Sequence, residues 1–366
     1  MVAKGEQAVK TIGLILAGGV GSRFWPLSRK NYPKQVLKLV GDREMINLTI
    51  DRCDPFITGT DMHIITNREQ AALLAEITGG RIPSGNIFIE PCGRNTAPCM
   101  LYSLMKLAKK YGDAVVCVLS ADQAIKDEHE FRKVLKNGAE YAACHDSIVA
   151  IGIVPTFPST GYGYIKKGQR QEAPFDLYRV EQFVEKPCQA KAEEYIGSGG
   201  YLWNSGMFIF RLSAALGMFL RHMPDMYSSM QPLAEKLGTS EEEPLLGEIY
   251  PCLERISFDY GIMEKERNIS VIPGDFGWSD IGAWNTLDDI MPADEQQNII
   301  RADHLGIDTT GCVIFSDDNR LIATLGITDL VIVSTGDSLL ICPRDRAQEI
   351  RKLTDLLEKH NRRDLL

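Results

Sequence analysis

Short apolar runs alternate with amphipathic helical patterns along the first two-thirds of this 366-residue chain, and this alternation restricts its fold more than any other feature. Strand and helix in alternation predict a mostly parallel sheet with helices on both faces. Ligands of such sheets bind at the carboxyl ends of the strands. The predicted strands cover residues 12–16, 62–66, 86–89, 114–119 and 148–154, and the predicted helices cover residues 45–53, 69–77, 97–110 and 131–144.

The remainder of the chain has a different pattern, in which strands (178–184, 202–210) and helical stretches (214–220, 233–237) are mixed. The composition turns polar around residues 289–297, which predicts a boundary between a larger α/β domain (1–290) and a small β-rich domain (291–366). No part of the smaller domain resembles a binding site. Its predicted strands, at 312–315, 321–325, 330–333 and 339–341, are separated by Asp, Asn and Gly turns, and a charged amphipathic helix at 345–359 ends the chain.

Composition excludes several classes of protein. An apolar fraction of 44% with 24% charged residues is typical of a globular protein. The net charge of −9 argues against a nucleic-acid binder, which needs a broad basic face. The nine cysteines are scattered and form no Cys-x-x-Cys pair, which favours reduced thiols over zinc or disulfides. The polar start and the short first apolar run resemble neither a signal peptide nor a membrane span, so we expect a soluble, cytoplasmic protein with no membrane partner.

The segment from Gly18 to Lys34 combines glycines with positive charge directly after the first predicted strand. Glycines at this place let the backbone turn with its N–H groups converging on an anion. The Arg23 guanidinium can bind two phosphate oxygens at once, and the Lys34 ammonium adds a compact charge. Five basic residues and no acidic one lie between Gly18 and Lys38. The segment therefore predicts a nucleotide-phosphate site, in preference to an ordinary glycine turn with solvated basic residues.

Two common phosphate motifs fail in this segment. A dinucleotide fingerprint counted from Gly19 has Phe24 where its last glycine belongs, which disfavours a nicotinamide oxidoreductase. The P-loop pattern Gly-x-x-x-x-Gly-Lys-Ser/Thr occurs nowhere in the chain.

Residues 16–35 instead read Leu-Ala-Gly-Gly-Val-Gly-Ser-Arg-Phe-Trp-Pro-Leu-Ser-Arg, followed by Pro-Lys-Gln. This resembles the signature of the sugar-1-phosphate nucleotidyltransferases, and in particular the mannose-1-phosphate guanylyltransferases, also called GDP-mannose pyrophosphorylases. The resemblance extends over nearly the whole chain and implies a Rossmann-like catalytic domain (1–290) with a mixed, mostly parallel sheet. Longer members continue into a sugar-isomerase domain, so isomerase activity is not expected here. The implied catalytic residues are Arg23 and Lys34, and the implied nucleotide-binding residues are Leu16, Ala17, Gly18, Gly19, Gly21, Ser22, Glu90, Arg94, Asn95, Thr96 and Ala121.

Two aspartates are candidate metal ligands. Asp122 follows the strand 114–119, so that its carboxylate faces the ligand crevice, and Asp280 lies in the segment 277–284. An Asx turn at Asp122 and a helix N-cap at Asp280 are the plain alternatives. The resemblance implies that both carboxylates bind Mg²⁺, which takes its remaining oxygens from phosphate and water. The family usually has His at the position of Gln123, and this departure puts the orientation of Asp122 in question.

Three segments (161–164, 183–187 and 203–207) resemble the family's sugar-phosphate motifs. The resemblance implies that Gly163, Glu185, Lys186 and Asn204 bind the sugar phosphate, although a strand-end ion pair or a turn explains each alone. The segment 89–98 resembles the family's base-binding motif. Guanine presents N–H donors that a carboxylate accepts, which makes Glu90 a candidate with Asn95, whereas Thr96 also fits a helix N-cap.

The implied reaction is in-line attack of mannose 1-phosphate on the α-phosphorus of GTP, which gives GDP-mannose and pyrophosphate. A phosphate monoester has its second pKa near ~6, so the nucleophile is ionised and needs no general base. The six histidines form no obvious catalytic pair. The sequence leaves three alternatives open: another sugar 1-phosphate, another nucleotide, and a catalytically silent homologue that binds GDP-sugar and regulates a partner. It also leaves the oligomeric state open, a homodimer included.

Overall fold

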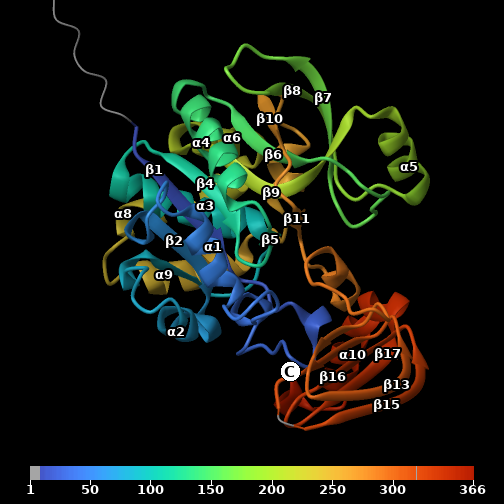
Figure 1. Ribbon diagram of the computed structural model, residues 1–366. Helices are drawn as coiled ribbons and strands as arrows, with labels where there is room; N and C mark the ends of the chain where they lie inside the picture. Colours follow the sequence, from blue (N-terminus) through green and yellow to red (C-terminus); the bar gives the residue numbers. More distant parts are fainter. Residues whose placement is uncertain (1–8, 319) are drawn as a thin grey trace, which may run out of the picture.

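The computed structural model describes residues 9–318 and 320–366, so most of the polar stretch before Thr11 lies outside the described part. Figure 1 shows a large α/β body built on a central sheet and a smaller β-rich body formed by the end of the chain. None of the helices in the described ranges has the length and apolar character needed to cross a membrane.

The central sheet has nine strands in the order β3-β2-β1-β4-β9-β6-β10-β8-β7. The strand β1 lies between β2 and β4 and is parallel to both. Of these nine strands, only β8 and β9 run against the common direction. The predicted mixed, mostly parallel sheet is therefore confirmed. The strands are β1 (Thr11–Leu16), β2 (Met62–Asn67), β3 (Ile87–Glu90), β4 (Val115–Ser120), β6 (Ile148–Ile153), β7 (Tyr164–Arg170), β8 (Tyr178–Val184), β9 (Tyr201–Arg211) and β10 (Ile269–Gly274).

Helices cover both faces of this sheet, which explains why β1, β4 and β6 are almost continuously apolar. One core lies under α3 (Thr96–Tyr111) and α6 (Leu212–His222), and the other under α1 (Met45–Cys53) and α4 (Glu128–Cys144). The N-cap of α3 is Asn95, whose side chain accepts from the backbone N of Thr96. The alternative role of Thr96 as N-cap was thus wrong by one residue, because Thr96 is already the first residue of the helix and the Asn95 side chain caps it.

The sequence prediction missed β7 and β10. The strand β7 carries mostly polar side chains (Tyr-Ile-Lys-Lys-Gly-Gln-Arg), so it lacks an apolar pattern. The strand β10 ends in Pro-Gly, which normally argues against a central strand. Here the proline falls near the end of the strand, and pairing with β6 and β8 holds it in the sheet.

The C-terminal body is a coil of short strands that alternate between two sheets. The strands β12, β14 and β16 are parallel neighbours in one sheet, while β13 and β15 pair in the other. Helix α10 (Ile350–Lys359) is followed only by a 3-10 turn at Arg363–Leu365, and the predicted helical residues 345–349 form a 3-10 turn instead. The β-rich domain with a terminal helix is therefore confirmed. Its strands are β12 (Ile299–Arg301), β13 (His304–Thr310), β14 (Val313–Ser316), β15 (Ile322–Thr328), β16 (Leu330–Ser334) and β17 (Leu339–Pro343).

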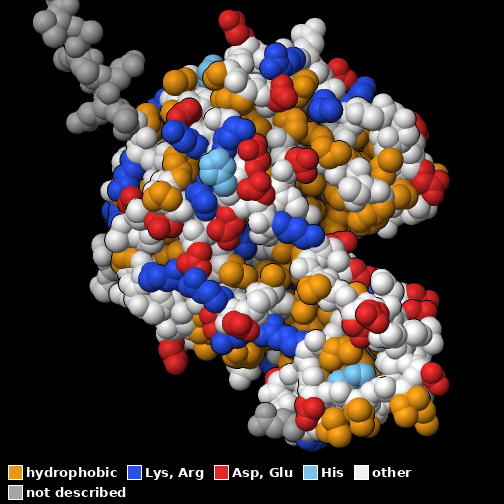
Figure 2. Space-filling view, in the orientation of Figure 1, with side chains coloured by type: hydrophobic (Ala, Val, Ile, Leu, Met, Phe, Trp, Pro, Cys, Tyr) orange, Lys and Arg blue, Asp and Glu red, His pale blue; other side chains and the backbone are white. Residues whose placement is uncertain are grey.

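The two bodies share one apolar core. Phe24 contacts Trp284 at 5.0 Å between ring centroids, and Trp284 contacts Phe315 of β14 at the same distance. Figure 2 shows a hollow in the surface between the lobe that carries α5 (Gln189–Ser198) and the C-terminal body. The predicted boundary at residues 290 and 291 stays a prediction, because this core includes residues from both sides of it.

Candidate active site

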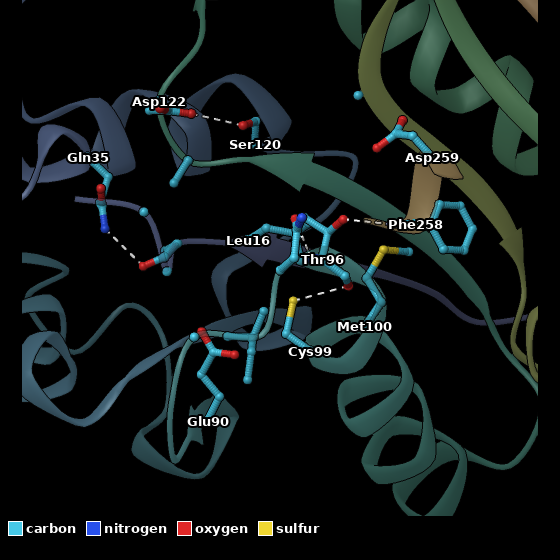
Figure 3. Close-up of a pocket in the computed structure, with 18 of the residues that line it drawn as sticks. Leu16, Gln35, Glu90, Thr96, Cys99, Met100, Ser120, Asp122, Phe258 and Asp259 are labelled. Carbon is cyan, nitrogen blue, oxygen red and sulfur yellow. Dashed lines mark hydrogen bonds between the residues drawn. The ribbon is translucent and has the colours of Figure 1, made fainter. Parts of the chain in front are cut away.

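Two adjoining cavities lie at the carboxyl ends of β1 and β4, where the alternating pattern predicts ligand binding. The first has a volume of about 550 Å³ and is drawn in Figure 3. The second has a volume of about 360 Å³. Ser120 and Asp122 line both cavities, so the end of β4 marks the junction between them.

The glycine segment after β1 is folded so that its two halves line different cavities. Ala17, Gly18 and Gly19 line the first cavity with the end of β1. Gly21 and the short 3-10 turn Ser22–Phe24 line the second.

Gly21 stands where the segment turns from the first cavity to the second, in a backbone conformation and surroundings that favour glycine. It has φ 71° and ψ 41°, and a Cβ there would lie 2.3 Å from the Cβ of Lys34. Only glycine therefore fits at this position.

Lys34 is buried and lines the second cavity. Its Nζ donates to Oδ2 of Asp122 at 3.0 Å and to the carbonyl oxygen of Asp280 at 2.7 Å. Burial raises the pKa of Asp122, but Lys34 and Ser120 outweigh it and hold that pKa below its usual value. The candidate catalytic lysine and both candidate metal ligands are thus brought together.

Asp280 has a further partner that the sequence motifs did not indicate. Its Oδ1 accepts from the hydroxyl of Tyr162 at 2.7 Å. Burial raises the pKa of Asp280 above its ordinary value, even though Tyr162 and Lys34 oppose that shift. Within residues 9–318 and 320–366, no group of three or more His, Cys, Asp and Glu side chains is placed to hold a metal ion. A cation between Asp122 and Asp280 would therefore need further oxygens from a ligand or water.

Arg23 lines the second cavity from an exposed position. Its guanidinium donates to the carbonyl oxygen of Gly282 at 3.3 Å and forms no ion pair with any other described residue. The side chain is consequently available to an anion in the cavity. Arg23, Lys34 and Gly21 meet there as the sequence predicts.

The far end of the first cavity presents a buried carboxyl group. Glu90 and Asp122 lie well apart along this cavity, with Leu16 between them (Figure 3). Oε2 of Glu90 accepts from the hydroxyl of Tyr250 at 2.6 Å, and its Oε1 lies near Gly18. Burial raises the pKa of Glu90, although the Tyr250 hydrogen bond opposes it. This carboxyl group can accept hydrogen bonds from a flat polar ligand.

The remaining members of the predicted base-binding segment separate in the structure. Asn95 and Thr96 line the first cavity, and Thr96 Oγ1 also accepts from the backbone N of Phe258 at 2.8 Å. Arg94 is not among the lining residues, because its guanidinium donates to the carbonyl oxygen of Pro251.

The four candidate sugar-phosphate residues converge beside the first cavity: Gly163 directly precedes β7, Glu185 and Lys186 directly follow β8, and Asn204 lies on β9. A Cβ on Gly163 would lie 2.5 Å from Oε2 of Glu185 and 3.2 Å from the Cβ of Asn204, so these residues are in contact. Lys186 Nζ donates to Oε1 of Glu185 at 2.5 Å. None of the four lines either cavity directly. Their link to the cavity is Asp259, whose Oδ1 accepts from Asn204 Nδ2 at 2.8 Å.

Asp259 was not a candidate in the sequence, yet it lines the first cavity on the side away from Gln35 (Figure 3). Desolvation and the nearby Glu185 carboxylate raise the pKa of Asp259 to about 6. Near neutral pH most of this group is ionised, and the carboxylate can accept hydrogen bonds from the hydroxyl groups of a sugar.

Gln123 is buried and turned toward the sheet. Its Nε2 donates to the carbonyl oxygen of Ser205 on β9 at 2.6 Å, and the backbone carbonyl oxygen of Gln123 accepts from the Arg52 guanidinium at 2.9 Å. Asp122 is oriented by Ser120 and Lys34 instead. The departure from the family's His therefore leaves Asp122 with two other orienting partners.

Several residues of the site were not predicted in the roles that the structure gives them. Tyr162 lies in the segment 161–164 that resembles a sugar-phosphate motif, and Tyr250 belongs to a 3-10 turn, but only the fold brings their hydroxyl groups to Asp280 and Glu90. Arg255 lines the first cavity and Arg351 of the C-terminal body lines the second. The expectation that the tail contains no site residue was thus wrong, because α10 packs against the turn Ser22–Phe24.

Comparison with known families gives two matches along the chain. Residues 12–297 match the Nucleotidyl transferase family, and residues 302–357 match the MannoseP isomerase/GMP-like beta-helix domain. The second match agrees with the coil of strands described above.

Comparison with curated proteins finds relatives over almost the whole chain. The mannose-1-phosphate guanylyltransferase of Klebsiella pneumoniae is 37% identical over 95% of this chain and 74% of its own length. The alginate biosynthesis protein AlgA of Pseudomonas aeruginosa is 36% identical over 96% of this chain and 73% of its own length.

Among solved structures, a Thermus thermophilus protein described as a mannose-1-phosphate geranyltransferase superposes with a TM-score of 0.85. It is 36% identical, and the superposition covers 95% of this chain and 99% of that one. A mannose-6-phosphate isomerase from Helicobacter pylori superposes with a TM-score of 0.61 at 25% identity, over 74% of this chain and all of that one.

Proposed function

The chain belongs to the nucleotidyl transferase family, and we propose that it transfers GMP from GTP to mannose 1-phosphate, forming GDP-mannose and releasing pyrophosphate. The relatives named as mannose-1-phosphate guanylyltransferases support this choice of reaction and substrates. The double cavity supports it independently, because the reaction needs room for a nucleoside on one side of a phosphate and for pyrophosphate on the other.

The observation that carries the proposal is the position of Asp122 at the junction of the two cavities, with the Lys34 ammonium against it. A GTP molecule with its base against Glu90 and its outer phosphates near Arg23 would place the α-phosphorus at this junction. The sugar phosphate would approach from the cluster around Asn204 and Asp259. The attacking and leaving oxygens then lie on opposite sides of the α-phosphorus, as in-line displacement requires.

Asp122 and Asp280 fit a hard divalent cation, and we assign Mg²⁺ to them. Both side chains offer carboxylate oxygens, the donors that Mg²⁺ prefers, and phosphate and water supply the rest. Bound there, the ion would neutralise charge on the phosphates of both reactants. Lys34 contacts Asp280 through the backbone carbonyl oxygen, so the carboxylate of Asp280 is not paired with the ammonium and can face the ion.

The residues of the chain position the reactants and neutralise charge. An oxygen of the sugar phosphate forms the new bond to the α-phosphorus, and the bond from that phosphorus to the bridging oxygen of pyrophosphate breaks. The nucleophile is already ionised, since the second pKa of a phosphate monoester is near ~6, so no residue needs to remove a proton. Lys34 neutralises the charge on the α-phosphate and Arg23 the charge on the departing pyrophosphate.

The decisive assay combines the purified chain with GTP, mannose 1-phosphate and Mg²⁺, and measures pyrophosphate release together with GDP-mannose. We expect both products in equal amounts, and neither after chelation of the metal. Replacing mannose 1-phosphate by glucose 1-phosphate or a heptose 1-phosphate, and GTP by ATP, tests the sugar and the base separately.

Binding without turnover would contradict the proposal. A chain that binds GDP-mannose tightly but forms no product with Mg²⁺ would be a silent regulatory homologue. Faster turnover with another sugar 1-phosphate would keep the reaction class and replace only the substrate.

A further inference from the structure

Hydrogen bonds and an ion pair join the segment that follows β1 to the C-terminal body. The indole nitrogen of Trp25 donates to the carbonyl oxygen of Leu365 at 2.8 Å. The Arg29 guanidinium donates to the same carbonyl oxygen and pairs with Asp337 at 2.6 Å. Trp25 and Arg29 follow the 3-10 turn that lines the second cavity. Their contacts with the end of the chain therefore fix the position of this segment against the C-terminal body.

Apolar packing fixes the start of α10 in the same place. Ile350, the first residue of α10, is buried in the core that also contains Phe24 and Trp284. Phe24 belongs to the turn that carries Arg23. The first turn of α10 and the turn of the phosphate segment are thus packed on one core and cannot move independently without opening it.

Arg351 follows Ile350 and lines the second cavity together with Arg23 and Lys34. Its side chain is exposed, and within the described ranges it forms no ion pair and donates no hydrogen bond to another residue. Its neighbour on the helix behaves differently, since Lys352 Nζ pairs with Glu349 at 2.8 Å. A guanidinium held at a cavity wall without a protein partner is suited to a ligand that carries several negative charges.

The charges of the second cavity favour such a ligand. Its lining contains three cationic side chains, Arg23, Lys34 and Arg351, and two carboxylates. The Asp122 carboxylate is already paired with Lys34, and the Asp280 carboxylate accepts from Tyr162. The two arginines are therefore left to bind an anion at the end of the cavity that lies toward the C-terminal body.

We propose that Arg351 of the C-terminal body binds the outer phosphates of the nucleoside triphosphate, and hence the departing pyrophosphate, so that the second body completes the active site. This inference rests on the proposed nucleotidyl transfer. It assigns Arg351 to the pyrophosphate side because the cluster of Asn204, Glu185 and Asp259 lies beside the first cavity instead.

The test compares Arg351→Ala with Arg351→Lys, and uses Lys352→Gln as the matched control on the same helix. Michaelis constants are measured for GTP in the forward reaction and for pyrophosphate in the reverse reaction, and GDP-mannose binding is measured at equilibrium. Loss of a bidentate phosphate contact should raise both Michaelis constants in Arg351→Ala about tenfold or more. GDP-mannose carries no outer phosphates, so its affinity should stay within about twofold of the wild type. The Michaelis constants of Arg351→Lys should lie between those of the wild type and those of Arg351→Ala. Lys352→Gln should match the wild type in every measurement.

Two results would overturn the inference. Unchanged Michaelis constants for GTP and pyrophosphate in Arg351→Ala would remove Arg351 from the site. An equal loss of affinity for GDP-mannose, or a lower thermal midpoint than that of Lys352→Gln, would show a structural role instead. Failure of the proposed function has a different signature, because the wild type itself would then release no pyrophosphate from GTP and mannose 1-phosphate.

Discussion

The ammonium of Lys34 lies 3.0 Å from Oδ2 of Asp122, although the two residues belong to loops that follow different strands of the central sheet. The pair is asymmetric, since the Lys34 side chain is almost fully enclosed while a third of the Asp122 side chain is exposed (6% against 36%). The lysine thus presents its charge at the wall of the cavity, where a phosphate can share it.

Replacing Lys34 by Met should abolish most activity, because Met keeps the length of the side chain and removes its charge. Removing one group that stabilises transition-state charge typically costs about 10²–10³ in turnover. The matched control is Lys38→Met, which removes an exposed lysine just beyond that segment that lines neither cavity. Steady-state kinetics of both variants provide the check, and comparable rates in the two would remove Lys34 from the catalytic machinery.

Substitution of Gly21 by Ala should destabilise the protein more than substitution of Gly41. Both glycines have positive φ (71° and 65°), a conformation that costs other residues roughly 1–2 kcal/mol. A Cβ on Gly21 would also collide with Lys34, whereas nothing lies within 4 Å of a Cβ on Gly41. Gly41→Ala therefore measures the backbone cost alone. Equal free energies of unfolding for the two variants would show that the segment moves aside for the extra methyl group.

Glu90→Gln should weaken the choice of guanine, because it replaces an acceptor-only carboxylate by an amide of the same shape. If Glu90 accepts hydrogen bonds from the N–H groups of guanine, kcat/KM for GTP should fall about tenfold to a hundredfold. ITP lacks the exocyclic amine of guanine, so its kcat/KM should change less. Tyr250→Phe serves as the control, since it removes the hydroxyl group behind the carboxylate and leaves the carboxylate in place. An unchanged ratio of GTP to ITP in Glu90→Gln would place base recognition elsewhere.

Asp259 should make stability depend on pH in a direction opposite to that of a paired aspartate. Its pKa is raised from 3.8 to about 6 by desolvation and Glu185, so the folded protein holds this proton more tightly than the unfolded chain does. Ionisation therefore favours unfolding, and its cost grows as the pH rises from about 4 to about 6 and is complete above that.

Asp259→Asn removes this cost. The variant should be more stable than the wild type by roughly 1–3 kcal/mol at about pH 7.5, and the difference should vanish near about pH 4. Denaturant unfolding at several pH values measures it, with the exposed Asp225→Asn as a control. A difference that did not change with pH would mean that Asp259 titrates normally. Sugar-phosphate affinity should fall in the same variant if Asp259 contacts the sugar.

The sequence predicted the strands and helices near the site well where side-chain periodicity was strong. Helix α1 and strand β8 were located at Met45–Cys53 and Tyr178–Val184, as the patterns indicated. Prediction failed for β7, whose side chains are mostly polar, because its partners β8 and β9 hold it in the sheet by backbone hydrogen bonds that leave no mark on side-chain hydropathy.

The sequence likewise predicted the place of some residues of the candidate site and not of others. Gly21, Arg23, Lys34, Asp122 and Asp280 meet in one cavity as their motifs indicated, whereas Arg94 is directed to Pro251. A motif fixes the backbone path and the chemistry available there, but the partner that a long side chain finally contacts depends on neighbours from elsewhere in the chain.

The sequence by itself determined that a strand runs into a basic, glycine-rich turn. It also determined that Asp122 follows another strand and that Asp280 lies in the segment 277–284, because these features are local. The tertiary structure alone decided that Asp259 faces the first cavity and that Arg351 lines the second. Both depend on packing between elements far apart in the chain: Asn204 on β9 orients Asp259, and the buried Phe24 and Ile350 bring α10 to the phosphate segment. Burial of apolar side chains supplies the free energy for that packing. A local sequence pattern cannot predict which distant residue a polar side chain will contact.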